Sequence, residues 1–255
     1  MADARPAILL GEDHHEYGEI GTASVGDRFG LAISRGAIPK WYEYTDPNED
    51  AVAVFRGSTG AALVAIDGHN GFTSTEVATE VLTAHFATHP PEALPTPAEL
   101  IDLFTEVSAG ILARTSAPDA PHPESRAALS VAFVVGSGVR WAAMGDAPIY
   151  LVGTGKAAQL SLDQHRFVGF SADRANHEQS LQVGDHELNA EEWLVLASDG
   201  FSDYAGSHSM NATGVAQSAL AGAGTGLAGA ESLVRAALDS DAADNVAVAV
   251  AAPQG

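Results

Sequence analysis

Short runs of aliphatic residues alternate along the chain with turns that contain Gly, Pro or Asp. Apolar runs of roughly four to eight residues between turn residues are typical of buried β-strands. The pattern predicts strands at residues 29–34, 51–56, 61–66, 129–135, 139–144, 149–152, 157–160, 193–197 and 246–251. Short glycine-containing turns at 136–138 and 153–155 connect consecutive predicted strands, so we expect hairpins there.

Helical patterns occur in separate parts of the chain. Apolar residues at helical spacing predict an amphipathic helix over residues 75–85. Thr96 has the position of an N-cap, with Pro97 at the first helical position and Glu99 three residues later. A second helix is therefore expected over residues 97–113.

The assignment of the remaining segments leads to an expected fold class. A further helix is predicted over 231–238, whereas 161–190 is polar and irregular and 201–229 holds helix fragments with a Gly/Ala-rich loop. Residues 224–229 fit G-x-G-x-x-G, but no strand precedes them, so a flexible loop is expected instead of a dinucleotide site. Because strands and helices form separate blocks, the pattern favours layered α+β over an alternating βαβ sheet.

Composition narrows the classes of partner and chemistry. The chain has 255 residues, 46% of them hydrophobic, which is enough for one domain with a sizeable core. A formal net charge of −21 repels nucleic acid and anionic membranes, so neither is expected as a partner. Cysteine is absent, which excludes disulfides, thiolate zinc sites and cysteine nucleophiles.

The N-terminal residues 1–10 lack a cationic start followed by a long apolar core. No secretory signal and no apolar stretch of ~20 residues is visible, so we expect a cytoplasmic protein, and we expect a monomer. Residues 1–25 are interpreted as a solvated N-terminal extension, and 26–255 as the folded domain. The acidic, His-containing patch at 12–16 is assigned to that extension in preference to a metal site.

Acidic residues repeatedly border the aliphatic strands. One acid at a strand end is ordinary, because Asp favours turns. Several acids gathered at one end of a sheet would repel one another unless cations neutralise them, and oxygen-only ligation indicates Mg²⁺ or Mn²⁺. The acids concerned are Glu49, Asp50, Asp67, Asp146, Asp199 and Asp244.

The stretch Asp-Gly-His-Asn-Gly at 67–71 follows a predicted buried strand, and we interpret Asp67 as a metal ligand. Two divalent ions that share a carboxylate and a water lower the pKa of that water and stabilise charge on a phosphoryl group. Such hydrolysis needs no protein nucleophile, in agreement with the missing cysteine. His69 can either protonate the leaving oxygen or hydrogen-bond loop carbonyls, and the sequence leaves both roles open.

Five blocks of sequence carry a resemblance to a known family. They are Asn-Glu-Asp-Ala at 48–51, Asp-Gly-His-Asn-Gly at 67–71, Met-Gly-Asp at 144–146, Leu-Val-Leu-Ala-Ser-Asp-Gly at 194–200 and Asp-Asn-Val at 244–246. In this order they resemble the metal-dependent protein phosphatases, the protein phosphatase 2C family, over about residues 27–251. The segment 159–165 is similar to the one that follows the family's central hairpins.

The resemblance implies a fold and a reaction. The fold is a four-layer αββα sandwich, in which two antiparallel β-sheets are flanked by helix pairs. The reaction is the hydrolysis of phosphoserine or phosphothreonine in a protein substrate, within signalling, by a water that bridges two Mn²⁺ or Mg²⁺ ions. A flap that tunes substrate choice is expected at about 165–190.

The resemblance also assigns roles to single residues. Asp67 would bridge the two ions, and the Gly68 carbonyl would ligate one of them. The other implied roles are Asp199 and Asp244 in the first metal site, Glu49 and Asp50 in the second, His69 as general acid, and Asp146 and Asp203 at a looser third metal.

The sequence departs from the family where the phosphate is held. The family usually has an arginine shortly before the Glu-Asp pair, whereas residues 44–47 contain no cation, and Arg35 or Lys40 is expected to reach in instead. This departure favours an alternative, a catalytically weak or silent phosphatase-like binding or regulatory module. A calcium-binding acidic structural protein is disfavoured, because its ligands would cluster in one short loop.

Overall fold

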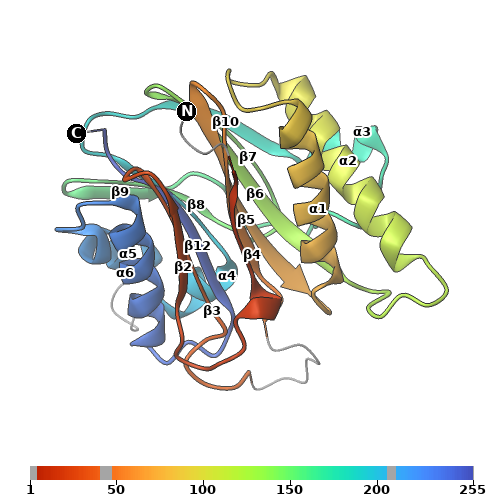
Figure 1. Ribbon diagram of the computed structural model, residues 1–255, viewed down its shortest axis with the longest axis horizontal. Coiled ribbons are helices and arrows are strands. Elements are labelled where there is room, and N and C mark those ends of the chain that lie inside the picture. Colours follow the sequence, from red (N-terminus) through yellow and green to blue (C-terminus); the bar gives the residue numbers. More distant parts are fainter. Residues whose placement is uncertain (1–4, 41–47, 206–210, 255) are drawn as a thin grey trace.

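Two six-stranded antiparallel sheets face each other at the centre of the computed structural model, which describes residues 5–40, 48–205 and 211–254 (Figure 1). The first sheet has the order β1 (Ala7–Leu10), β4 (Ala51–Arg56), β5 (Gly60–His69), β6 (Arg126–Val135), β7 (Gly138–Met144) and β10 (Gln182–Glu187). The second has the order β2 (Gly21–Val25), β3 (Phe29–Ser34), β12 (Val246–Ala251), β11 (Trp193–Ala197), β8 (Ile149–Gly153) and β9 (Lys156–Gln159).

Helices cover the outer face of each sheet (Figure 1). On the first sheet lie α1 (Thr73–Thr88) and α2 (Pro97–Thr115), with α3 (Arg174–Ser180) beside α2. On the second lie α4 (Asp199–Tyr204), α5 (Ala212–Leu220) and α6 (Gly226–Leu238), and a short 3₁₀ turn, η1 (Gly11–Asp13), follows β1. The expected αββα sandwich is confirmed. None of the helices in these described ranges has the length and apolarity needed to cross a membrane.

The hydrophobic core has three parts, one between the sheets and one between each sheet and its helices. Strand β5 contributes to two of them. Ala62 and Val64 face the helices, whereas Leu63 and Ala65 face the second sheet. Because successive side chains of a strand point to opposite faces, a strand buried on both faces needs an unbroken apolar run, which the sequence pattern shows.

The N-terminal residues differ from the expected solvated extension. Strand β1 pairs with β4, and β2 pairs with β3, so residues 7–10 and 21–25 form an outer strand of each sheet. The pattern hid them because edge strands tolerate partial exposure: every residue of β1 is half-buried. The patch at 12–16 therefore lies in the connection between two strands.

Two other segments also differ from the pattern. The polar stretch 161–190 contains α3 and β10, and β10 pairs with β7 as an edge strand with a polar sequence. The G-x-G-x-x-G stretch does not remain a loop, because Thr225 caps α6 and Gly226 begins it. The expected capping box of α2 is confirmed, with Thr96 Oγ1 accepting from Glu99 N at 3.3 Å and Glu99 Oε2 accepting from Thr96 N at 2.6 Å.

Register brings four strand ends together at one end of the sandwich. In the first sheet Ala51 pairs with Ile66, so the residues just before β4 lie beside those that follow Ile66 in β5. In the second sheet Ala197 pairs with Val248, so the residues just after β11 lie beside those that precede β12. Segments distant in sequence thus meet at the acids that the sequence analysis selected.

Candidate active site

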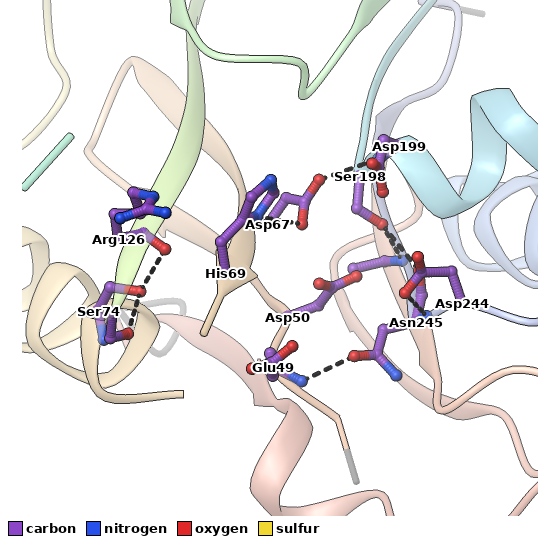
Figure 2. Close-up of polar contacts among 12 residues, drawn as sticks. Glu49, Asp50, Asp67, His69, Ser74, Arg126, Ser198, Asp199, Asp244 and Asn245 are labelled. Carbon is purple, nitrogen blue, oxygen red and sulfur yellow. Dashed lines mark hydrogen bonds and ion pairs between the residues drawn. The ribbon is translucent and has the colours of Figure 1, made fainter. Parts of the chain in front are cut away.

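A small acidic cavity lies at this shared end of the two sheets. It has a volume of about 60 Å³ and is hereafter the acidic cavity. Figure 2 shows acids from both sheets gathered at this place, with Asp50 between Asp67 and Asp244. The lining residues are Lys40, Glu49, Asp67, Gly68, His69, Asp199 and Asp244. The structure therefore brings together six of the residues predicted as metal ligands or general acid, and one predicted phosphate contact.

Two glycines let the backbones of the site approach each other closely. A Cβ at Gly68 would lie 2.2 Å from the Glu49 carbonyl oxygen, and a Cβ at Gly200 would lie 1.9 Å from that of Asn245. Neither position has room for a side chain. The Asp-Gly steps at 67–68 and 199–200 are therefore needed to bring the acids of one strand end against the next.

Asn245 ties the first sheet to the second, a role that the sequence analysis did not assign. Its Oδ1 accepts from Glu49 N at 2.9 Å, and its Nδ2 donates to the Arg35 carbonyl at 3.0 Å. Its own backbone N–H donates to Asp244 Oδ1 at 2.7 Å. Asn245 is 2% exposed, so these hydrogen bonds form in a low-dielectric setting. They hold Asn245 against the Glu49 backbone and the Asp244 carboxylate.

Ser198 is a second supporting residue that sequence reasoning missed. Its Oγ accepts from Ala247 N at 2.9 Å and donates to the Asn245 carbonyl at 3.4 Å, and the side chain is buried. The signal was present in the sequence, because Ser198 and Asn245 each adjoin a selected acid. These polar side chains hold the ends of β11 and β12 together (Figure 2).

Asp67 and His69 lie two residues apart on β5, so both project from the same face of the strand. His69 Nδ1 is 3.4 Å from Asp67 Oδ1, and Asp67 Oδ2 accepts from Asp199 N at 3.3 Å. Burial lowers the pKa of His69, but the Asp67 carboxylate outweighs it and raises that pKa to about 9. Conversely, burial raises the pKa of Asp67, and the His69 charge brings it below its ordinary value.

Four acids in and near the cavity have raised pKa values, because burial and their acidic neighbours both disfavour negative charge. Burial and the Asp67 carboxylate raise the pKa of Asp50 and of Asp199 well above the ordinary value. The same two causes raise the pKa of Asp146 to about 6. Burial, together with Asp244 and Asp67, also raises the pKa of Asp203. A site with this much uncompensated negative charge favours cations.

The donor chemistry fits divalent metal ions. Asp50 Oδ2 and Asp146 Oδ1 are buried and have no hydrogen-bond partner within the described residues. Carboxylate and carbonyl oxygens line the cavity, and these are the ligands that Mg²⁺ and Mn²⁺ prefer. Among the described residues, however, no three His, Asp or Glu side chains are already arranged around one metal position. The fit therefore rests on the donor set and on the unpaired oxygens.

Asp146 and Asp203 lie outside the lining of the acidic cavity. Asp146 is in the turn between β7 and β8, and Asp203 is in α4. Both interact electrostatically with Asp67, since its charge contributes to the raised pKa of each. Both are therefore close enough to interact electrostatically with the cavity, although neither lines it.

The two expected phosphate contacts have different places. Lys40 lines the cavity, and its Nζ is 2.5 Å from Asp244 Oδ1 and 3.6 Å from Glu49 Oε2. The Arg35 guanidinium points elsewhere: it donates to the His15 carbonyl at 2.8 Å and lies 4.2 Å from the Tyr17 ring centroid. The expectation for Arg35 is therefore not met, because the connection after β1 engages this side chain.

The position where the family usually has its arginine, residues 44–47, lies outside the described residues. Within the part of the chain that the structure describes, Lys40 is the only lysine or arginine that lines the acidic cavity. Burial lowers the pKa of Lys40, but the nearby Asp244 outweighs burial and raises it. The ammonium is therefore charged beside the acids.

A family model matches most of the chain. It is described as Protein phosphatase 2C and matches residues 42–236. The chain belongs to this family. A search of curated proteins finds no match.

Solved structures of bacterial phosphatases share the fold. Serine/threonine phosphatase Stp1 from Staphylococcus aureus has a TM-score of 0.72 and 20% identity, covering 94% of this chain and 100% of its own. Serine/threonine phosphatase PstP/Ppp from Mycobacterium tuberculosis has a TM-score of 0.64 and 22% identity, with coverages of 89% and 99%. A PstP catalytic domain in complex with two manganese ions has a TM-score of 0.66 and 20% identity, covering 88% and 97%. At these identities the likeness shows the fold.

Proposed function

We propose that this protein is a metal-dependent protein phosphatase that hydrolyses phosphoserine and phosphothreonine monoesters. The observation that carries the proposal is the acidic cavity, where oxygen donors from both sheets converge with one imidazole and one ammonium. Family membership supports the reaction type, and the bacterial structures of the same fold are described as serine and serine/threonine phosphatases. The proposed substrate is a phosphorylated protein.

Two Mn²⁺ or Mg²⁺ ions are the proposed cofactors, with a looser third site. When bound, they would supply an activated water and neutralise charge on the phosphoryl group. Asp67 would be shared between the first two sites, and the Gly68 carbonyl would ligate one of the ions. The remaining proposed ligands are Asp199 and Asp244 for the first ion, Glu49 and Asp50 for the second, and Asp146 and Asp203 for the third.

His69 is the proposed general acid. In the metal-free protein the Asp67 carboxylate raises the pKa of His69 to about 9, so the imidazole carries a proton there at neutral pH. The ring lines the cavity, where that proton can pass from the imidazole to the leaving serine or threonine oxygen. Donation at this atom avoids the expulsion of an unprotonated alkoxide.

Lys40 is the proposed phosphate contact. Its ammonium can hold a phosphoryl oxygen as a point charge, which is the way that lysine binds phosphate. In the structure this ammonium contacts Asp244 and Glu49, so Lys40 would exchange carboxylate oxygens for phosphoryl oxygens when substrate binds.

The experiment is a titration of aryl-phosphate hydrolysis with MnCl₂, together with calorimetric measurement of Mn²⁺ binding. Asp67→Asn is expected to lower kcat/KM by about a thousandfold or more, which corresponds to ~4 kcal/mol, and to weaken Mn²⁺ binding. Asp119→Asn, at an exposed position, is the matched control and should behave as wild type. Wild-type protein that binds Mn²⁺ but hydrolyses neither aryl phosphate nor any phosphopeptide would overturn the proposal.

A silent binding or regulatory module remains the second candidate, because residues 44–47 lack the arginine that the family usually has. That candidate makes the opposite prediction for the same variant. Asp67→Asn would leave binding of a phosphoprotein partner intact, and wild type would show no turnover. A pull-down with both variants, read beside the hydrolysis assay, separates the two functions.

A further inference from the structure

We propose that Arg126 and Arg166 recognise a carboxylate side chain of the substrate protein close to its phosphorylated residue. This proposal rests on the phosphatase function proposed above and extends it to the class of substrate. Arg126 is the strand partner of His69, and Arg166 precedes Phe167, whose ring contacts the His69 ring. Neither arginine lines the acidic cavity. The chemistry that they fit is an acidic peptide segment.

Arg126 lies directly beside the proposed general acid. In the ladder between β5 and β6, Arg126 is the partner of His69. Directly opposed residues of an antiparallel pair project from the same face, with Cβ atoms about 5 Å apart. The Arg126 backbone is held in place by α1, because Ser74 Oγ donates to the Arg126 carbonyl at 2.8 Å (Figure 2).

The segment 166–170 runs alongside the start of β6 and contacts both His69 and Arg126. Ala127 and Val168 form an isolated antiparallel bridge, with N–H···O distances of 2.9 and 3.2 Å. The Phe167 ring lies 4.6 Å from the His69 ring, measured between centroids, and the Arg126 guanidinium lies 4.8 Å from the Phe170 centroid. One short segment therefore links the general acid to Arg126.

Residues of this segment also line a pocket of about 330 Å³. We call it the flap pocket, since it lies mostly within the expected flap at 165–190. Six of its lining residues are Arg166, Phe167, Phe170, Ser171, Asn176 and His177. Phe170 is 56% exposed and Arg166 is also exposed, so an apolar surface and a guanidinium are open to a ligand next to the catalytic end of β5.

Arg126 and Arg166 differ from several other arginines of the chain in that no carboxylate among the described residues pairs with them. Arg126 Nη1 donates to the Glu124 carbonyl at 3.2 Å, and Arg166 Nη1 donates to Ser180 Oγ at 2.7 Å. A guanidinium has five N–H donors, so each retains donors for a carboxylate. By contrast, carboxylates pair with Arg114, Arg140, Arg174 and Arg235.

Charge explains why such a pair is needed. The chain has 33 acidic and 12 basic residues, so its overall field repels an acidic substrate segment. Local guanidinium groups offset that repulsion at the point of contact, and the planar fork of arginine binds a carboxylate with two parallel hydrogen bonds. The exposed Phe170 ring beside the Arg126 guanidinium adds apolar contact to the substrate backbone.

The test uses matched phosphothreonine peptides that differ only at positions flanking the phosphothreonine, where they carry Glu, Gln or Lys. The readout is the ratio of kcat/KM values between peptides for one protein variant, because a general loss of activity leaves this ratio unchanged. Wild type is expected to prefer the Glu peptide over the Gln peptide by about tenfold. Arg126→Gln/Arg166→Gln should bring that ratio close to one, and Arg166→Glu should favour the Lys peptide.

Arg114→Gln is the matched control, since Arg114 is an exposed arginine on α2 that is paired with Glu80, and it should keep the preference for Glu. Arg126→Lys/Arg166→Lys should keep most of it, because the positive charges remain. A wild-type ratio near one, or a double Gln variant that keeps the wild-type ratio, would overturn the proposal. If wild type does not hydrolyse aryl phosphate at all, the proposed phosphatase function fails instead. Fluorescence anisotropy with the same peptides would then still measure whether the two arginines favour binding of the Glu peptide.

Discussion

In the acidic cavity Asp67 is 4% exposed and Glu49 only 1%, and backbone amides hold both carboxylates. In the flap pocket, whose Phe167 ring contacts the His69 ring, Phe170 is 56% exposed and Arg166 donates to one serine hydroxyl. Both regions adjoin the same strand ends. They differ in that backbone amides hold the buried carboxylates of the first, whereas the second presents an exposed ring and an exposed guanidinium.

This difference separates chemistry from recognition. Groups that hold ions or transfer a proton must keep fixed positions, because small displacements weaken transition-state contacts. Groups that recognise a peptide can remain exposed and still discriminate by charge. Substitutions in the acidic cavity should therefore change kcat, metal affinity and stability together, whereas substitutions in the flap pocket should change the ratio between substrates.

The sharpest test of the comparison is His69→Gln, in the acidic cavity. Removal of a general acid lowers kcat by about 10²–10⁴-fold for a phosphothreonine peptide, whose leaving oxygen needs a proton. For p-nitrophenyl phosphate, whose leaving oxygen is stable as an anion, we expect a loss at least tenfold smaller. His165→Gln, at an exposed histidine, is the control and should leave both rates unchanged. Equal losses with the two substrates would contradict the general-acid role.

Sequence alone located the acids because each one borders an aliphatic run, and runs buried on both faces are easily recognised. Asp67 follows the apolar part of β5, and Asp199 follows β11. The strand prediction was slightly short, since β5 continues through His69 and pairs with β6 to its end. Pairing with Arg126 extends the strand into residues whose own propensities favour a turn.

The flap pocket could not be predicted in this way, because it depends on pairings between distant residues. The partnership of His69 with Arg126 follows from the β5–β6 register, and that of Ala127 with Val168 from a single bridge. Strand β10 is polar, and its exposure as an edge strand removes the apolar signal. Lys40 illustrates the same limit, since its sequence position gives no sign of its contact with Asp244.

Gly200→Ala tests whether the acidic cavity is fixed by backbone contact. The new Cβ would lie 1.9 Å from the Asn245 carbonyl oxygen, so the start of α4 must move away from β12. Overpacking of this kind costs about 3 kcal/mol, equivalent to a decrease in Tm of roughly 6–12 °C for a chain of this size. Gly224→Ala, where a Cβ meets no atom within 4 Å, is the control. Equal Tm values for the two variants, measured by calorimetry, would show that the cavity backbone is adaptable.

Lys40→Gln separates the two effects of the cation in the cavity. The ammonium lies 2.5 Å from Asp244 Oδ1 and therefore competes with a divalent ion for that oxygen. Its removal should tighten Mn²⁺ binding by about tenfold, or ~1.4 kcal/mol, in calorimetric titrations without substrate. The KM for a phosphopeptide should rise by a similar factor, because a phosphate contact is lost. The control is Lys156→Gln, because Lys156 is the other lysine of the chain and lies exposed in a hairpin; this variant should change neither value. Unchanged Mn²⁺ affinity in Lys40→Gln would exclude the competition.

Asp146→Asn should have the smallest effect and a definite dependence on pH. Burial and the Asp67 charge raise the folded-state pKa of Asp146 to about 6, whereas its ordinary value is 3.8. The folded state thus binds this proton more tightly than the unfolded state, so the carboxyl group lowers stability as pH rises from about 4 through 6 and by a constant amount above that. Below pH 4 both states are protonated and the effect vanishes.

In metal-free protein with EDTA, Asp146→Asn should therefore match the wild-type Tm near pH 4 and exceed it near pH 7. We expect a gain of about 1 kcal/mol, because partial exposure and solvent screening reduce the full effect of the shift. This corresponds to roughly 2–4 °C. Asp119→Asn should show no such trend, since this carboxylate is exposed. A difference in Tm between Asp146→Asn and wild type that is the same at every pH would contradict this prediction. It would mean that the negative charge of the acidic cavity does not raise the pKa of Asp146.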